Sequence, residues 1–314
     1  MGEHPEIDLC LTAPYGIRVP SWPRVFEQVE QFGLADDRGA WVSLIRRWLA
    51  ALASDVEGAE VVECDDAFVV TSLRGGQRDR FVEFFRRGAR TVSDKLRGRV
   101  ISEEWPAVLI DLPDTEQFVD YMASISPDDG EADDSIVGAA MCVREGYVHV
   151  VLNGSYRDDW HMSLLHELVH ACLYDLEAPL WYEEGLAELL PEVILGYSYY
   201  RASPELVRRH REHWRRVGLD PFWRGEAFAS PESSELAYHL GQSLTRRIVS
   251  IGGVDVARLT ETISDEDAGT KAIRTLVGRE LAAFATEILG DGDWAASADL
   301  WEDRPKERGR LPLN

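Results

Sequence analysis

The chain has 314 residues, of which 45% are hydrophobic, and this is enough apolar material to bury a large core in one domain or two. Its formal net charge of −23 argues against nucleic-acid binding, because affinity for phosphates comes from clustered cations. We interpret the acidic excess as a solvated surface, and attraction of basic peptides is the functional alternative.

Neither a secretory signal nor a membrane span is predicted. The first thirty residues lack a basic head followed by a long apolar run, and no later stretch reaches eighteen uninterrupted apolar residues. The four cysteines, Cys10, Cys64, Cys142 and Cys172, are widely spaced and form no CxxC pair, which favours a reducing compartment. We therefore expect a cytoplasmic protein.

Helical and strand patterns alternate in the first hundred residues. Apolar residues at helical spacing predict two amphipathic helices between Trp22 and Val56, joined at Gly33–Asp37. The segment Ala59–Leu73 is rich in Val and Phe and predicts a strand, and Arg78–Leu96 then returns to helical spacing.

A second strand and helix follow. Ala107–Leu112 is a short apolar run between two prolines and predicts a strand, and Asp114 is a candidate N-cap for a helix over Thr115–Met122. The segment Ser126–Ser135 contains five carboxylates among turn formers, so we expect a solvated loop. A calcium loop is the weaker alternative, because the acidic residues do not keep the register of an EF-hand.

The remainder is a strand pair followed by helices. Val137–Val143 and Gly146–Leu152 predict two strands, and the pattern is almost wholly helical from Trp160 to about Leu289. The polar, proline-containing stretch Asp291–Asn314 predicts a tail. The whole predicts an α+β fold with a small mixed sheet and a mainly helical C-terminal half. The expected parts are a helical N-terminal segment (1–56), an α/β part (57–155), a helical part (156–290) and the polar tail (291–314).

The segment His166-Glu167-Leu168-Val169-His170 is an HExxH motif inside a helical run. The i, i+4 spacing places both imidazoles on one helical face, where they can bind a single Zn²⁺ at about 2.0–2.1 Å. Glu167 lies about 100° further round the helix, which suits a general base. Cys172 falls with the apolar residues of this helix, so we interpret it as a buried small hydrophobe and not as a ligand.

A second helix start follows the break at Pro179 and reads Leu-Trp-Tyr-Glu-Glu-Gly-Leu-Ala-Glu from Leu180 to Glu188. HELVH followed by WYEEGLAE resembles the gluzincin metallopeptidases, and within them the peptidase MA-like group. The resemblance implies a zincin-like catalytic domain and makes Glu184, separated from His170 by thirteen residues, the third metal ligand, with Glu183 as the competing choice. It also implies that the last strand before the motif, Gly146–Leu152, is the sheet edge that pairs with substrate.

Other side chains are assigned by position. Glu188 lies four residues after Glu184 and is expected to accept the second ring N–H of a ligating histidine, with an ordinary surface glutamate as the alternative. Tyr238 is the favoured oxyanion donor, His239 is the competing choice, and a core tyrosine is the alternative.

The remaining histidines are weaker candidates. His210 and His213 lie in an arginine-rich helical run typical of an exposed face. His149 lies on the strand that the resemblance makes the edge, where it could line a substrate cleft, although a lone strand histidine is more often simply packed. His161 lies five residues before His166 and so on a different helical face.

Together these residues predict a cytoplasmic zinc metallopeptidase that acts on peptides or proteins, with Glu167 as base to a water activated by Zn²⁺. The related aminopeptidases carry a GxMEN motif on the sheet, whereas Gly138–Cys142 reads GAAMC without the acidic residue, which favours an endopeptidase. The first alternative is a non-catalytic, zinc-stabilised binding protein whose N-terminal helices dock a partner. The second is a chance HExxH motif in a protein of other function.

Overall fold

A computed structural model describes residues 7–65, 67–101, 105–125, 138–144, 147–198 and 203–296. The predicted acidic loop at 126–135 and residues 297–314 of the predicted tail lie outside the described residues. The chain forms two compact units, and each is described by itself. Unit 1 comprises Met1–Arg90 and Val100–Tyr174, and unit 2 comprises Thr91–Arg99 and Asp175–Asn314.

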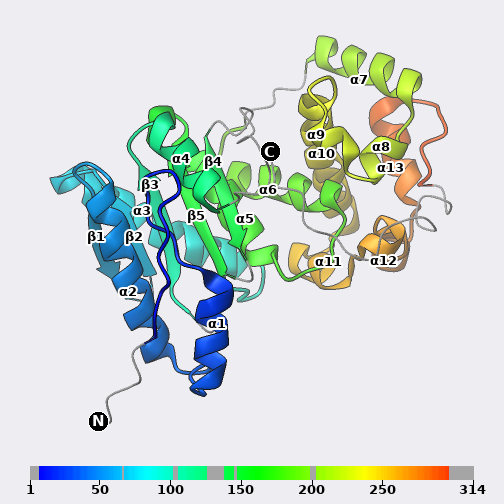
Figure 1. The fold of residues 1–314 in the computed structure, drawn as a ribbon. Coiled ribbons are helices and arrows are strands. Elements are labelled where there is room, and N and C mark those ends of the chain that lie inside the picture. The colour runs from blue at the N-terminus through cyan, green and yellow to red at the C-terminus, as the bar shows by residue number, and fades with distance from the viewer. Residues whose placement is uncertain are drawn as a thin grey trace. The chain divides into compact units, whose positions relative to one another are not determined.

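Unit 1 contains a mixed sheet with the strand order β1-β2-β3-β5-β4 (Figure 1). The three inner strands are parallel to one another, and the two outer strands pair antiparallel with their neighbours. The strands are β1 (Glu60–Cys64), β2 (Ala67–Thr71), β3 (Ala107–Leu112), β4 (Ala139–Arg144) and β5 (Tyr147–Asn153). Every residue of β5 is buried, as expected for an inner strand covered on both faces.

Helices α1 (Trp22–Gln31), α2 (Arg38–Asp55) and α4 (Thr115–Ile125) bury their apolar sides on one face of this sheet. Trp22 stacks on Tyr147 of β5 with ring centroids 4.0 Å apart. Because α1 and α2 share this core with the strands, the N-terminal helices are an integral layer of unit 1.

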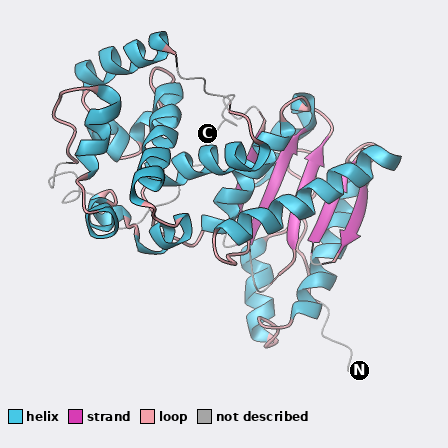
Figure 2. Ribbon diagram, turned by 180° about the vertical axis from the view of Figure 1, so that it is seen from behind, coloured by secondary structure: helices cyan, strands magenta, loops and turns pink. Residues whose placement is uncertain are grey.

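The opposite face of the sheet carries α5 (Trp160–Leu173) beside β4 and β5, and α3 (Gly75–Lys95) packs on α5. Gly88 of α3 makes this packing close, since a Cβ there would lie 2.9 Å from Leu165 of α5. Figures 1 and 2, seen from opposite sides, show helices over both faces of the sheet. The short η1 turn (Gly154–Tyr156) connects β5 to the loop before α5.

Unit 2 is built from helices and short connections. The helices are α6 (Leu180–Leu195), α7 (Pro204–Val217), α8 (Asp220–Trp223), α9 (Glu226–Ala229), α10 (Ser234–Gly252), α11 (Val256–Thr262), α12 (Thr270–Val277) and α13 (Leu281–Leu289), with a 3-10 turn, η2 (Asp265–Asp267). Its most extensive helix pair is α6 with α10. Trp181, at the start of α6, is fully buried and donates its indole N–H to the carbonyl oxygen of Ala268.

The α+β class, the small mixed sheet and the helical C-terminal part are confirmed. Two predictions about strands are wrong. Ala59–Leu73 is not one strand but the hairpin β1–β2, which turns where Asp65 takes a φ of 46°. The strand expected over Gly146–Leu152 is not a sheet edge, because β5 pairs with β3 on one side and β4 on the other. The edge next to the HExxH helix is β4.

All four cysteines are free thiols, and Cys142 and Cys172 are buried. Within the described ranges, no helix combines the length and hydropathy that crossing a membrane requires.

Candidate metal centre

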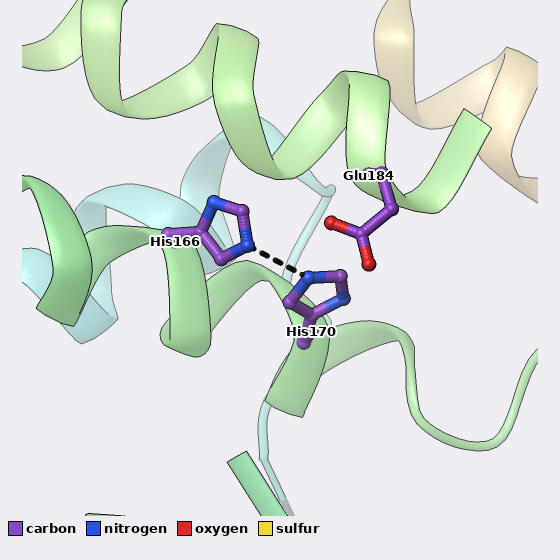
Figure 3. A group of neighbouring side chains, drawn as sticks. All are labelled: His166, His170 and Glu184. Atoms are coloured by element: carbon purple, nitrogen blue, oxygen red, sulfur yellow. Dashed lines mark hydrogen bonds between the residues drawn. The ribbon is translucent and has the colours of Figure 1, made fainter. Parts of the chain in front are cut away.

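His166 and His170 lie one turn apart on α5 and present their rings to each other (Figure 3). Their Nε2 atoms are 3.0 Å apart. His170 is only 2% exposed and His166 is half-buried, so the pair lies at the border of the interior. The predicted i, i+4 juxtaposition of the two imidazoles is therefore present in the fold.

The other sides of α5 hold the helix in the core. Leu165, Leu168, Val169 and Cys172 are all buried, as the predicted apolar arc requires. Cys172 is thus confirmed as a buried small side chain. Because these contacts anchor the helix, the two histidines have a fixed backbone beneath them.

Glu167 is directed toward the sheet. Its carboxylate is 8% exposed, and its Oε2 accepts a hydrogen bond from the main-chain N–H of Met141 on β4, 2.6 Å away. This hydrogen bond joins the carboxylate of the motif helix to the backbone of the strand beside it. The neighbouring Cys142 thiol has its pKa raised, first by burial and second by the negative charge of Glu167.

Glu184 lies on the first turns of α6, and its side chain is 1% exposed. Among the described residues, the group able to hold a metal ion consists of His166, His170 and Glu184, whose ligand atoms all lie within 4.8 Å of one another. Figure 3 shows the carboxylate of Glu184 directed toward the two rings. Glu183, the competing choice, is half-buried and is not part of this group.

The donor set fits Zn²⁺. Two nitrogens at about 2.0–2.1 Å from a tetrahedral ion are about 3.3 Å apart, close to the observed 3.0 Å between the two Nε2 atoms. Two histidines and one glutamate also form a known catalytic zinc set, which leaves a coordination position for water. The residues present thus match the group that the sequence predicts.

The residues assigned by position lie on α6 and α10. Glu188 is half-buried. Burial first, and the charge of Arg246 second, lower the pKa of His239, and the charges of Glu235 and Glu188 oppose this shift. Tyr238 is half-buried, and its ring meets Phe228 edge-on at 5.2 Å. The proposed roles of Glu188 and Tyr238 stay predictions.

His210 is not on an exposed face as the arginine-rich sequence suggested. It is 1% exposed, its Nδ1 accepts from the indole N–H of Trp214 at 3.1 Å, and its Nε2 lies 2.6 Å from Nδ1 of His239. The indole can only donate, so Nε2 of His210 carries the proton of the neutral ring and donates to His239. Burial lowers the pKa of His210 to about 3, which keeps its ring neutral.

His149 is packed in the core and does not line a cleft. It is fully buried on β5, with its Nε2 2.7 Å from the hydroxyl of Tyr121 on α4. Burial lowers its pKa to about 3. His161 stacks on Trp160 with ring centroids 3.8 Å apart.

Comparisons of the chain with protein-family models, with curated proteins and with solved structures found no match. The assignment of the site is therefore supported by its own residues and geometry and not by relatives. Sequence reasoning missed one contributor, the main-chain N–H of Met141, because a backbone group leaves no residue signature and its direction depends on strand pairing.

Proposed function

We propose that this protein is a zinc-dependent metallopeptidase of the gluzincin type with a zincin-like fold. The observation that carries the proposal is the geometry of the two histidines, whose Nε2 atoms lie 3.0 Å apart on helix α5. Glu167 stands between them in the sequence, and its carboxylate is hydrogen-bonded to the edge strand β4. His166, His170 and Glu184 are the proposed ligands.

When bound, zinc would polarise the scissile carbonyl and lower the pKa of a water molecule toward neutrality. Glu167 takes the proton of the attacking water and passes it to the leaving amine, so its carboxylate begins and ends the cycle ionised. Tyr238 donates to the oxyanion, and Glu188 orients a ligating imidazole.

The proposed substrate is an extended peptide, and the proposed reaction is internal cleavage. Within the described part of the chain, the strand next to α5 that pairs on one side only is β4, and its register with β5 puts Gly138–Cys142, the GAAMC segment, along that edge. An extended chain can add to such an edge through main-chain hydrogen bonds, independently of its side chains. The segment carries no carboxylate that would hold a free amino terminus, which favours an endopeptidase. The net charge of −23 favours basic substrates.

The test uses purified full-length protein loaded with one equivalent of Zn²⁺ and offered unstructured basic and acidic polypeptides. We expect internal cleavage that a chelator abolishes and zinc restores. Glu167→Gln should retain zinc and lose cleavage, whereas Glu177→Gln, which changes an exposed carboxylate beyond α5, should cleave like wild type.

Two results would contradict the proposal. Zinc binding without cleavage of any polypeptide would favour the zinc-stabilised binding protein, and absence of zinc binding would leave HExxH as a chance motif. Equal cleavage by Glu167→Gln and wild type would refute the assigned base.

A further inference from the structure

The contact between Met141 and Glu167 joins the edge of the sheet to the HExxH helix. Strand β4 pairs antiparallel with β5, and Met141 lies opposite Val150. The carbonyl of Gly138 accepts from the N–H of Asn153, so Gly138 and every second residue after it direct their backbone N–H and C=O groups toward β5. Met141 is one of the residues in between. Its N–H therefore points away from β5, out of the sheet edge, where Glu167 accepts it.

This arrangement meets the needs of a buried carboxylate. Glu167 is 8% exposed, and a carboxylate removed from water is costly unless hydrogen bonds compensate it. The N–H of Met141 supplies such a bond at 2.6 Å. A main-chain donor in a paired strand is also rigid, so it fixes direction more firmly than a flexible side chain does.

We propose that the main-chain N–H of Met141 is a positioning group for Glu167. It holds Oε2 at the sheet edge and thereby sets the direction in which the other carboxylate oxygen meets a water molecule. This role rests on the proposed peptidase function, whereas the contact itself can be measured without any activity. The role belongs to the main-chain N–H and not to the side chain of Met141.

The catalytic consequence is tested with Met141→Pro, which removes this N–H. Because the N–H lies outside the β4–β5 ladder, and edge strands tolerate proline at such positions, the pairing should persist. Val143→Pro is the matched control, since the N–H of Val143 also points away from β5, Val143 lies outside the proposed substrate-binding segment Gly138–Cys142, and Glu167 accepts from Met141 instead. We expect Met141→Pro to keep one zinc per chain and an unchanged KM, with kcat lowered on the order of 10-fold or more relative to the control. Equal kcat values for the two proline variants would overturn the role.

The contact is tested separately by NMR on metal-free protein labelled with [15N]methionine. The sequence has four methionines, so the spectrum is simple, and Met122 and Met162 serve as internal references. We expect the Met141 amide proton to resonate downfield and to move upfield in Glu167→Ala while both references stay in place. An unmoved Met141 signal would overturn the contact. A wild type that cleaves no peptide would refute the proposed function and the catalytic role together, and the amide signal would still decide the contact.

Discussion

Gly185 and Gly241 face each other where α6 packs against α10. A Cβ on Gly185 would lie 2.4 Å from the carbonyl oxygen of Gly241, and a Cβ on Gly241 would lie 2.8 Å from the carbonyl oxygen of Trp181. The obstacles are backbone atoms, which cannot rotate away. Packing thus explains why a glycine follows Glu184 in the sequence. The missing side chain lets α10 pack directly on the turn of α6 that carries the proposed ligand.

Gly185→Ala should therefore destabilise unit 2. The added methyl group must separate two packed helices, and we expect a loss of about 1–3 kcal/mol or more in the free energy of unfolding. Urea unfolding followed by circular dichroism measures it. Gly76→Ala is the control, since a Cβ there meets nothing closer than 3.5 Å, to Arg80, and alanine favours the helix. Equal stability of the two variants would show that α6 and α10 are not in close contact.

Glu184 and Glu183 can be distinguished by zinc affinity. Glu184 is buried within the group of potential ligands, whereas Glu183 is half-buried outside it. Glu184→Gln should weaken zinc binding by at least about 10-fold, because an amide oxygen is a poorer ligand than a carboxylate. Glu183→Gln should bind zinc like wild type. Competition with a chromophoric chelator gives both constants, and the reverse order would move the third ligand to Glu183.

Tyr238 can be tested as the proposed oxyanion donor. Tyr238→Phe keeps the ring that packs on Phe228 and removes only the hydroxyl. If the hydroxyl stabilises the developing negative charge, kcat should fall about 10² to 10³-fold with little change in KM. The exposed Tyr197 provides the control variant Tyr197→Phe. An unchanged kcat would exclude Tyr238 and leave His239, whose ring is oriented by His210, as the donor to test next.

Two buried histidines make the fold sensitive to acid. Burial lowers the pKa of His149 and of His210 from 6.5 to about 3. Below pH 6.5 the unfolded chain takes up protons that the folded protein does not, so the stability contributed by each neutral ring is present above pH 6.5 and is lost as pH falls toward 3. Each histidine should lower the free energy of unfolding by up to about 1.4 kcal/mol for each unit by which pH falls in this window.

The double variant His149→Phe/Tyr121→Phe isolates one of these contributions. It replaces both partners of a buried hydrogen bond by apolar rings of similar shape, so stability at pH 7 should change little. Between pH 6 and pH 4 the variant should lose stability less steeply than wild type. Chemical unfolding at several pH values compares the slopes, and identical slopes would mean that His149 is not held neutral by burial.

The order of elements was largely predictable, because it depends on local patterns. The helical spacing of Trp22–Val56 and the proline-bounded run Ala107–Leu112 correspond to α1, α2 and β3. Asp114 was expected as a cap, and its carboxylate does accept from the N–H of Gln117. The β1–β2 hairpin was missed because the Val- and Phe-rich pattern continues on both sides of Asp65 and Asp66, and these two turn formers were given too little weight.

The arrangement of the strands was not predictable from such patterns. Whether β4 or β5 lies at the edge depends on pairing between distant segments, since β5 joins β3 across about forty residues of sequence. His210 was misjudged because its arginine neighbours conceal a stripe of Leu206, His210 and Trp214 at four-residue spacing, and all three are buried. The HExxH motif was readable because its two histidines depend on helical periodicity alone.

We propose that His166, His170 and Glu184 together bind one zinc ion. A crystal structure of the zinc-loaded full-length chain, with anomalous differences measured on both sides of the zinc absorption edge, tests it most directly. We expect a single anomalous peak about 2.0–2.2 Å from both Nε2 atoms and from a carboxylate oxygen of Glu184. A zinc peak elsewhere, or a zinc-binding chain with no peak between these residues, would show that they are not the zinc ligands.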